Sequence, residues 1–387
     1  MRICLLTPTF LPRIGGAEIC IDQLARNFVQ RGHEPVVVAE RVRNTTDEPQ
    51  TNYPLVRYEP TISQRGCYLR LKKRLTRLHR QYDFQIINAH MAYPGAYVGL
   101  WFARRYGVPL VVTPHGGGVF YRSRFRSRPT VWRRIQAGLN AADAVISLSS
   151  YFDKLLAEIA PHQRHIVRIG NGVNNADFSD PDIKLNPALH RRCGKRFVLG
   201  LGRLVTRKGF DTAIIAFSQI AGDFPDLNLV FAGDGPERAK LERLAEQLQI
   251  KDRVVFLGMI VGSEKIALLR ECLFTVVPSV EEDNMPLVVL ESLACGKPVI
   301  GSRLGGIPDI VCDAQNGLLC PPGDPDSLAA ALAKLATPAV TEKITPDLYT
   351  VAECMAPAAL ATARRLDWHM IAGEYLQLFD RLTTDKQ

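Results

Sequence analysis

The sequence predicts an α/β protein with two doubly wound, Rossmann-like domains in tandem. Three observations predict this fold. Short apolar runs alternate with helical stretches along the chain, which is typical of βαβ units and parallel sheets. The alternation pauses once, in a polar segment near the middle, and then restarts. The 387 residues, of which 47% are hydrophobic, suffice for two domains that each bury a full core.

In the first half of the chain, predicted strands are separated by helical stretches such as residues 17–31 and 96–106. The predicted strands are residues 2–7, 34–39, 85–89, 110–113, 144–147 and 166–168. Residues 171–189, rich in Asn, Asp and Pro, then interrupt the pattern. We interpret the stretch near 172–190 as a linker between the two domains.

The second half repeats the alternation. Its predicted strands are residues 197–200, 227–232, 254–257, 273–277 and 298–302. Its predicted helices are residues 209–221, 237–249, 263–272, 286–295, 325–335 and 366–382. Residues 337–356 are rich in Thr and Pro and lack periodicity, so they are predicted to form a loop or insertion. Doubly wound sheets bind ligands at the carboxyl ends of their strands, which places the expected site there.

Composition excludes several classes of protein. No run of 18 or more apolar residues is present, and the N-terminus lacks the pattern of a signal peptide. The nine cysteines are odd in number, irregularly spaced and without a Cys-x-x-Cys pair. This spacing argues against a zinc site or a disulfide framework and favours a reducing, cytoplasmic location.

The positive charge is concentrated in the first half. Residues 1–180 contain 25 Lys and Arg against 13 Asp and Glu, a net charge of +12, whereas the remainder has a net charge of −3. Two basic clusters dominate, one from Arg65 to Arg80 and one from Arg122 to Arg134. Such asymmetry indicates an acidic partner: an anionic membrane surface, a phosphate-bearing acceptor or nucleic acid.

The segment from Pro278 to Asp309, PSVEEDNMPLVVLESLACGKPVIGSRLGGIPD, carries the clearest functional pattern. A strand ends, an acidic loop follows, and a helix starts near Pro286, a residue suited to the first helical turn. N–H groups at a helix start favour anions, so this segment is suited to a diphosphate or to sugar hydroxyls. The residues placed at that helix start are Asn284, Met285, Pro286, Leu287 and Val288. Asp283 and Glu291 can accept hydrogen bonds from hydroxyls at different points along one ligand. The alternative is that Asp283 is an acidic helix cap and Glu291 an ordinary glutamate of the helix.

This segment resembles the signature of the retaining glycosyltransferases of family 4, and the likeness extends over nearly the whole chain. The resemblance implies a GT-B fold, in which two Rossmann-like domains face each other across a cleft and a C-terminal helix crosses back to the first domain. Residues 1–172 with the helix at 366–387 would form the acceptor-side domain. Residues 173–365 would form the domain that binds the nucleotide-sugar donor.

In the resembled family, the residue matching Glu291 binds the ribose hydroxyls of the nucleotide, and the residue matching Asp283 contacts the donor sugar. The family usually has Glu at the position that Asp283 occupies here. Asp is one methylene shorter and reaches less far, so the neighbouring Glu282 is an alternative for the same role.

A loop after the first strand of the second domain carries Gly202, Arg203 and Lys208. An Arg and a Lys five residues apart, on a loop that opens a helix, can clamp a diphosphate from two sides. A surface loop with ion pairs is the alternative. In the resembled family, the residues matching Arg203 and Lys208 neutralise the departing nucleotide phosphate.

Two glycine-rich turns in the first domain complete the predicted site. Gly15 and Gly16 precede the first helix, and by resemblance they form the loop that approaches the donor phosphates and the acceptor. An ordinary strand-to-helix turn is the alternative there. His115 follows a strand and precedes three glycines, and the matching family histidine contacts the donor sugar. A structural histidine is the alternative, and His90, after the preceding strand, is a second candidate.

Strand ends in the second domain would line the pocket for the nucleotide base, largely through backbone atoms. These residues are Gly233, Asp234, Gly258, Met259 and Ile260. The triplet Asn171-Gly172-Val173 resembles the hinge of the family, and it precedes the predicted linker.

The resemblance implies transfer of a sugar from a UDP- or GDP-linked donor to a hydroxyl of a glycan or lipid-linked acceptor, in polysaccharide or glycoconjugate biosynthesis. The product would keep the anomeric configuration. Because Arg203, Lys208 and helix N-termini would stabilise the departing diphosphate, we expect no cofactor and no metal. The alternatives are a GT-B-fold epimerase acting on the nucleotide sugar itself, and a non-catalytic protein that binds a sugar nucleotide or nucleic acid.

The basic clusters suggest how such an enzyme would meet its acceptor. Each basic residue close to an anionic bilayer contributes about 1 kcal/mol of attraction. We therefore expect peripheral docking on the inner face of the cytoplasmic membrane, with a solvated basic face as the alternative. No recognised nucleic-acid-binding motif accompanies the clusters, so no nucleic acid is expected as a partner.

Overall fold

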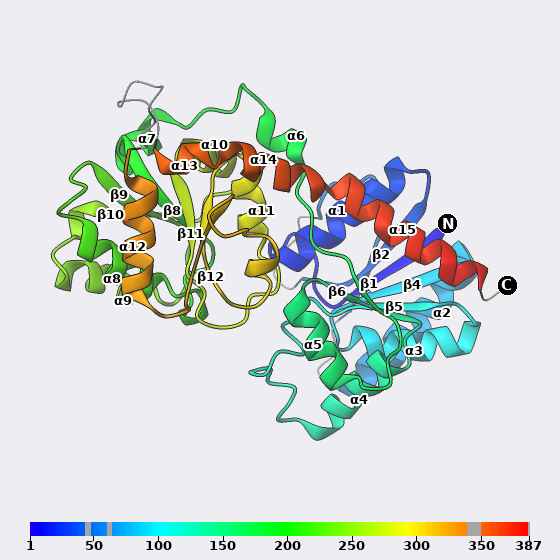
Figure 1. Ribbon diagram of the computed structural model, residues 1–387. Coiled ribbons are helices and arrows are strands. Elements are labelled where there is room, and N and C mark those ends of the chain that lie inside the picture. The colour runs from blue at the N-terminus through cyan, green and yellow to red at the C-terminus, as the bar shows by residue number, and fades with distance from the viewer. Residues whose placement is uncertain (43–47, 60–63, 339–349, 386–387) are drawn as a thin grey trace. The chain divides into compact units, whose positions relative to one another are not determined.

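The computed structural model of the protein describes residues 1–42, 48–59, 64–338 and 350–385 (Figure 1). The chain divides into two compact units. Unit 1 comprises Met1–Asn171 and Trp368–Gln387, and unit 2 comprises Gly172–Asp367. Each unit is built around one parallel β-sheet with helices on both faces, so the α/β class predicted from the sequence is confirmed.

Within the described residues, the sheet of unit 1 has seven strands in the order β3-β2-β1-β4-β5-β6-β7. The strands are β1 (Arg2–Thr7), β2 (Glu34–Glu40), β3 (Leu55–Tyr58), β4 (Ile86–His90), β5 (Leu110–Thr113), β6 (Ala144–Ser147) and β7 (Ile166–Arg168). Strands β4, β5 and β6 are buried along their whole length, as expected for a parallel sheet covered on both faces.

Helices α1 (Gly16–Gln30) and α15 (Trp368–Thr384) cover one face of this sheet. The other face is covered by α2 (Gln64–Tyr82), α3 (Gly95–Tyr106), α4 (Pro129–Asn140) and α5 (Ser150–Ile159) (Figure 1). The strand order reverses direction at β1 and β4, because the chain first adds β2 and β3 on one side and then β4 to β7 on the other. Right-handed crossovers therefore place the later helices on the opposite face from α1.

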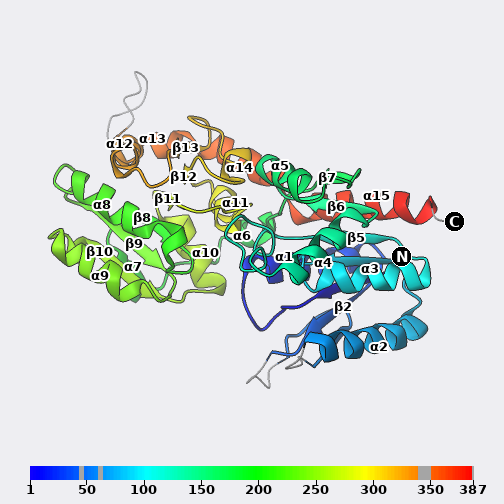
Figure 2. The same cartoon turned by 90° about the horizontal axis from the view of Figure 1, so that it is seen from below.

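Within the described residues, the sheet of unit 2 has six strands in the order β10-β9-β8-β11-β12-β13. The strands are β8 (Arg196–Leu201), β9 (Leu227–Ala232), β10 (Val254–Gly258), β11 (Phe274–Val277), β12 (Val299–Ser302) and β13 (Gly317–Cys320). Helices α8 (Phe210–Ile220), α9 (Arg238–Gln247) and α12 (Pro325–Ala336) pack together on one side of the sheet, and α10 (Gly262–Glu271), α11 (Leu287–Ala294) and α14 (Ala356–Arg365) pack together on the other (Figures 1 and 2).

The structure differs from the sequence prediction in several places, and helix α14 is among the elements that were not predicted. The edge strands β3 and β13 were not predicted. The segment predicted as a linker contains two short helices, α6 (Asn175–Ser179) and α7 (Pro187–Cys193). The predicted loop at 337–356 is wrong for α13 (Val351–Cys354), whose first turn is fixed by a capping box between Thr350 and Glu353, while residues 339–349 of that prediction lie outside the described residues.

In the part of the chain that the structure describes, no helix combines the length and the apolar character needed to cross a bilayer.

Candidate functional site

The carboxyl ends of the strands in unit 2 gather most of the residues predicted from the sequence. The loops after β8 and β9 pack there with their main chains in contact. A Cβ atom at Gly233 would lie 1.9 Å from the carbonyl oxygen of Gly202, and one at Gly235 would lie 2.2 Å from that of Leu204. Only glycine permits this approach, so the two loops form one rigid edge beside the sheet.

Lys208 ends the short helix η1 (Thr206–Lys208) and forms an ion pair with Asp283, which lies in the loop after β11. Ser279 donates a hydrogen bond of 3.2 Å to the same carboxylate oxygen, Oδ2. The two charged side chains are only 15% and 13% exposed. Burial alone would raise the pKa of Asp283, but the Lys208 ammonium, the Arg207 guanidinium and the Ser279 hydroxyl together outweigh burial and hold that pKa below its ordinary value. Asp283 is therefore an ionised carboxylate at physiological pH.

Two further glycines enclose the main chain that leads to Asp283. A Cβ atom at Gly209 would lie 2.0 Å from the carbonyl oxygen of Pro278, and one at Gly305 would lie 2.2 Å from that of Asp283. The N–H of Gly306 donates a hydrogen bond of 2.9 Å to the Asp283 carbonyl. The loops after β8, β11 and β12 therefore meet at Asp283.

Arg203 lies on the same edge, directly after Gly202, and its side chain is exposed. Among the described residues, no carboxylate forms an ion pair with its guanidinium. The edge thus presents two exposed cations, Arg203 and Arg207, and one partly buried cation, Lys208. Three cations on the loop that opens α8 give this edge the chemistry of an anion-binding site.

Helix α11 carries Glu291 on its inner side, where the residue is 9% exposed. Lys265 of α10 forms an ion pair with its Oε1 at 2.7 Å. The sequence pattern predicts Glu291 but not Lys265, which stands 26 residues earlier in the chain. No local pattern signals such a partner, because the pairing depends on how α10 and α11 pack.

The start of α11 differs in detail from the prediction. Pro286 has an extended main chain, with φ −68° and ψ 125°, and the helix begins only at Leu287. Asn284 and Met285 are buried in the loop before it, so their N–H groups are not part of the first helical turn. Of the predicted N–H donors, those of Leu287 and Val288 belong to the helix start. Glu282 lies in the same loop and is partly exposed.

The ends of β9 and β10 carry the residues predicted to line a base pocket. Gly258 has φ +81°, and its carbonyl oxygen accepts a hydrogen bond of 2.7 Å from the N–H of Gly233. After it, Ile260 is partly exposed and Met259 is 70% exposed. Asp234 is exposed, and its carboxylate accepts a hydrogen bond of 2.7 Å from the N–H of Gly235. The glycine contact places the ends of β9 and β10 side by side.

In unit 1, Gly15 is the N-cap of α1 and Gly16 is its first residue. The carboxylate of Glu18 folds back over Gly15, where a Cβ atom would lie only 2.5 Å from Oε2. Gly16 is exposed, whereas Glu18 is buried. A ligand can therefore approach this turn at Gly16, while the position beside Gly15 is occupied by the glutamate.

His115 follows β5 in unit 1 and has φ +55°. Its Nε2 and the Nδ1 of His90 are 2.9 Å apart, and the two rings are stacked with centroids 5.2 Å apart. Burial lowers the pKa of His115 to about 4, and burial together with the His115 ring lowers the pKa of His90 well below its ordinary value. The structure thus joins the two histidine candidates into one neutral pair.

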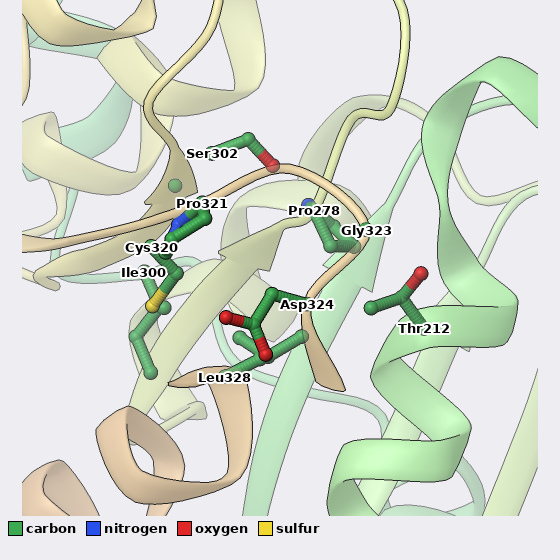
Figure 3. Close-up of a pocket in the computed structure, with 10 residues that line it drawn as sticks. Thr212, Pro278, Ile300, Ser302, Cys320, Pro321, Gly323, Asp324 and Leu328 are labelled. Atoms are coloured by element: carbon green, nitrogen blue, oxygen red, sulfur yellow. The ribbon is translucent and has the colours of Figure 1, made fainter. Parts of the chain in front are cut away.

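In unit 2, a pocket at the carboxyl ends of β11, β12 and β13 lies beside the loops after β8 and β11 (Figure 3). Its lining includes Thr212, Ser302, Cys320 and Asp324 and none of the predicted site residues. The Asp324 carboxylate is already used as the cap of α12, where it accepts hydrogen bonds from the N–H groups of Asp326 and Ser327. Within the described residues, no group of three or more His, Cys, Asp or Glu side chains is arranged to hold a metal ion.

Comparison with known protein families gives two matches that follow one another along the chain. A model described as "Glycosyltransferase Family 4" matches residues 14–177, and one described as "Glycosyl transferases group 1" matches residues 184–341. The first match ends and the second begins close to the division between unit 1 and unit 2.

Several curated proteins are similar over most of their length. Glycogen synthase of Mycobacterium tuberculosis is 30% identical, over 76% of this chain and 73% of its own. Alpha-monoglucosyldiacylglycerol synthase of Streptococcus pneumoniae is 29% identical, over 91% of this chain and 82% of its own. The GDP-mannose-dependent alpha-(1-6)-phosphatidylinositol monomannoside mannosyltransferase of Mycolicibacterium smegmatis is 29% identical, over 86% and 88%.

Solved structures share the whole fold. Sucrose-phosphate synthase from Thermosynechococcus elongatus superposes with a TM-score of 0.80 at 24% identity, covering 99% of each chain. Anabaena Alr3699/HepE in complex with UDP-glucose superposes with a TM-score of 0.78 at 21% identity, covering 98% of this chain and 100% of that one. These matches confirm the predicted GT-B fold class.

Proposed function

The chain belongs to glycosyltransferase family 4, and we propose that it transfers a sugar from a nucleoside diphosphate sugar to a hydroxyl of a lipid-linked or glycan acceptor, with retention of the anomeric configuration. The observation that carries the donor assignment is the edge formed by Arg203, Lys208 and Asp283 after β8 and β11. Two cations and an ionised carboxylate at the carboxyl ends of parallel strands fit a diphosphate joined to a sugar.

In this proposal, Arg203 and Lys208 stabilise the negative charge that develops on the departing diphosphate. The N–H groups of Leu287 and Val288, at the start of α11, add partial positive charge to the same region of unit 2. Glu291 accepts hydrogen bonds from the ribose hydroxyls, and Lys265 holds one of its oxygens in place. Because the chain's own cations supply this stabilisation, we propose a reaction that needs no metal.

Replacement of Arg203 tests the phosphate assignment. We expect Arg203→Ala to lower turnover by about 10²-fold, the loss typical for one preorganised charge-stabilising group. Initial rates with saturating donor measure this effect. Arg192→Ala, on α7 of the same unit, is the control for the removal of an arginine. A loss of only a few-fold in Arg203→Ala would contradict the clamp.

Replacement of Glu291 tests the nucleotide assignment. We expect Glu291→Ala to abolish donor binding measured by calorimetry, because the ribose loses its acceptor and Lys265 loses its partner. A Glu291→Ala protein that binds donor with near-normal affinity would remove Glu291 from the proposed site.

The donor and the stereochemistry are open to direct measurement. A thermal-shift screen of UDP- and GDP-sugars identifies the donor, because a ligand that binds only the folded state raises apparent stability by mass action. NMR of the product then reports the anomeric configuration, and inversion would contradict the proposal.

Incubation of donor without acceptor separates transfer from epimerisation, since only an epimerase would convert the sugar under that condition.

For the acceptor, we propose a lipid-bearing molecule reached from an anionic membrane surface. The names of two relatives refer to a glucosylated diacylglycerol and to a phosphatidylinositol monomannoside, which supports this choice. In unit 1, α2, α3 and α4 lie side by side and contain no acidic residue (Figures 1 and 2). Arg134 of α4 stacks over Tyr68 of α2 and Tyr97 of α3, with the guanidinium 5.5 and 4.9 Å from the ring centroids. These contacts join the two basic clusters into one surface.

The outer side chains of this surface fit a bilayer boundary. Leu69 is 63% exposed and Tyr121 is 50% exposed, close in sequence to exposed basic residues such as Arg70 and Arg124. Such mixed basic and apolar surfaces bind anionic interfaces through charge attraction and shallow insertion. The side chain of Arg65, at the start of the first cluster, lies outside the described residues.

Vesicle co-sedimentation tests the membrane proposal. We expect binding to vesicles that contain anionic lipid at low salt, and weaker binding for the double variant Arg70→Glu with Lys73→Glu. The matched control is Arg243→Glu with Lys240→Glu, on α9 of unit 2. Equal binding to neutral and anionic vesicles, or none at low salt, would contradict it.

A further inference from the structure

Two charged side chains that the proposed function assigns to the donor are paired with each other. Lys208 would bind the diphosphate, and Asp283 would contact the sugar, yet the structure joins them in a partly buried ion pair. A diphosphate that recruits Lys208 must therefore compete with the Asp283 carboxylate. The two donor contacts are coupled, because Lys208 cannot bind the phosphate without weakening its ion pair with Asp283.

Asp283 is the fixed member of this pair. Its carbonyl oxygen accepts a hydrogen bond from Gly306, and its main chain is in contact with Gly305. Ser279 also holds its carboxylate. Lys208, in contrast, carries its ammonium on a flexible four-carbon chain. An exchange of partners at this site would therefore occur by movement of Lys208, while the carboxylate stays in place.

We propose that the Lys208–Asp283 pair exchanges partners when donor binds: the diphosphate takes the Lys208 ammonium, and the Asp283 carboxylate then accepts hydrogen bonds from hydroxyls of the sugar. This inference rests on the proposed function and specifies the order of events at the same site. It also gives Asp283 a role that fits its short side chain, because the carboxylate need only replace one nearby partner by another.

The exchange favours the intact donor over the nucleoside diphosphate product. A buried carboxylate that loses its partner is costly. With a nucleoside diphosphate sugar, the hydroxyls of the sugar replace the ammonium. With a nucleoside diphosphate alone, nothing in the ligand does so, and the lost ion pair weakens binding. The pair would thus help to release the product after transfer.

Calorimetry on the full chain with Asp283→Asn tests the exchange. The probes are UDP with UDP-glucose and GDP with GDP-mannose, and the pair that the wild type binds is the one compared. Asn keeps the shape of Asp and can still accept the Ser279 hydroxyl, but it does not hold an ammonium strongly. We expect the variant to bind the nucleoside diphosphate at least about 5-fold more tightly than the wild type, in the usual range for coupling between two ligand contacts.

The same variant should lose most of the preference for the sugar-bearing ligand. Glu281→Gln, two residues earlier in the loop, removes the same charge and is the matched control, with an expected change in diphosphate affinity of less than about 2-fold. A folded Asp283→Asn protein that binds the diphosphate no more tightly than the wild type would overturn the exchange. An equal gain in affinity in Glu281→Gln would also overturn it. The gain would then come from the loss of any one negative charge in this loop, and not from release of Lys208. Asp283→Ser serves as a second variant if the Asn protein is unstable.

Lys208→Met separates this inference from the proposed function. If Lys208→Met binds the diphosphate more weakly while Asp283→Asn shows no gain, the phosphate site stands and the exchange fails. If Lys208→Met and Arg203→Ala both bind the diphosphate like the wild type, the proposed phosphate site itself fails.

Discussion

His90 and His115 form the least expected pair of side chains in unit 1. His90 is fully buried, and its Nε2 has no hydrogen-bond partner among the described residues. The neighbouring polar side chains are Asn88 and Thr113, which are also buried and hydrogen bond to each other at 3.1 Å. Since both imidazole pKa values are lowered, His115 is a neutral ring at physiological pH, and its contact with His90 helps to fix the ring orientation.

This pair should make unit 1 sensitive to acid. The pKa of His115 falls from an ordinary 6.5 to about 4 in the folded protein, so the unfolded chain binds more protons between these values. Stability is therefore present above pH 6.5 and is lost as the pH falls toward 4, by up to about 1.4 kcal/mol per pH unit for each such histidine. We expect His90→Asn, which does not titrate, to flatten this dependence.

Urea unfolding followed by tryptophan fluorescence measures the effect. All three tryptophans, Trp101, Trp132 and Trp368, belong to unit 1, so the signal reports that unit. His162→Asn, an exposed histidine of the same unit, is the control and should leave the slope unchanged. An unchanged slope in His90→Asn would mean that His90 does not contribute.

At the same scale, the sequence predicts the kinds of residue in the site but not their partners. Arg203, Lys208, Asp283 and Glu291 lie on motifs that stand next to predicted strands and helices, so position along the chain locates them. Their pairings depend on tertiary structure: Lys208 and Asp283 are 75 residues apart in the chain. The ion pair between Lys208 and Asp283 forms because the loops after β8 and β11 pack together, and no local sequence pattern encodes that contact.

Among the elements, the loop after β12 is constrained by its contact with Asp283. Gly305 has φ +61°, and its main chain approaches the carbonyl of Asp283. An alanine there would face both an unfavourable main-chain conformation and a contact of 2.2 Å with that oxygen. The loop would have to move away from Asp283, and the proposed donor site would lose one of the three loops that meet there.

We therefore expect Gly305→Ala to weaken nucleoside diphosphate binding by 10-fold or more, about 1.4 kcal/mol. Gly296→Ala is the matched control. Gly296 has φ +70°, but the nearest atom to its Cβ would be at an ordinary 3.5 Å, so it experiences the main-chain cost without the clash. Calorimetry and thermal unfolding of both variants separate the two costs. Equal effects on binding would show that loop contact at Asp283 does not matter.

Among the elements, the sequence predicts several strands with their exact bounds. The predicted strands at 2–7, 110–113, 144–147 and 227–232 coincide with β1, β5, β6 and β9, because buried parallel strands are continuous apolar runs bounded by polar turns. β3 and β13 lie at the edges of their sheets and were missed, although the edge strands β7 and β10 were predicted, so neither edge position nor length alone accounts for the two misses. α13 depends on its capping box more than on periodicity, which explains why a periodicity search misses it.

At the scale of the whole molecule, the chain passes between the two units twice, after Asn171 and after Asp367. On the unit 2 side the two passages are fastened together. The N–H of Val173 donates a hydrogen bond of 2.8 Å to the carbonyl of Leu366, and the Asn175 side chain donates one of 2.8 Å to Asp367. The last helix, α15, then belongs to unit 1, although it follows the entire sequence of unit 2.

Unit 1 therefore depends on the end of the chain for its core. Phe379 of α15 is fully buried and packs edge-on against Phe28 of α1, with ring centroids 5.9 Å apart.

We expect Phe379→Ala to destabilise unit 1 by about 3–5 kcal/mol, the usual cost of removing a buried phenylalanine side chain. Met370→Ala, at a side chain 57% exposed on the same helix, should change stability by less than about 0.5 kcal/mol. The readouts are tryptophan fluorescence, which reports unit 1, and nucleoside diphosphate binding, which reports unit 2. Loss of diphosphate binding in a Phe379→Ala protein whose fluorescence transition is unchanged would contradict this division of the molecule.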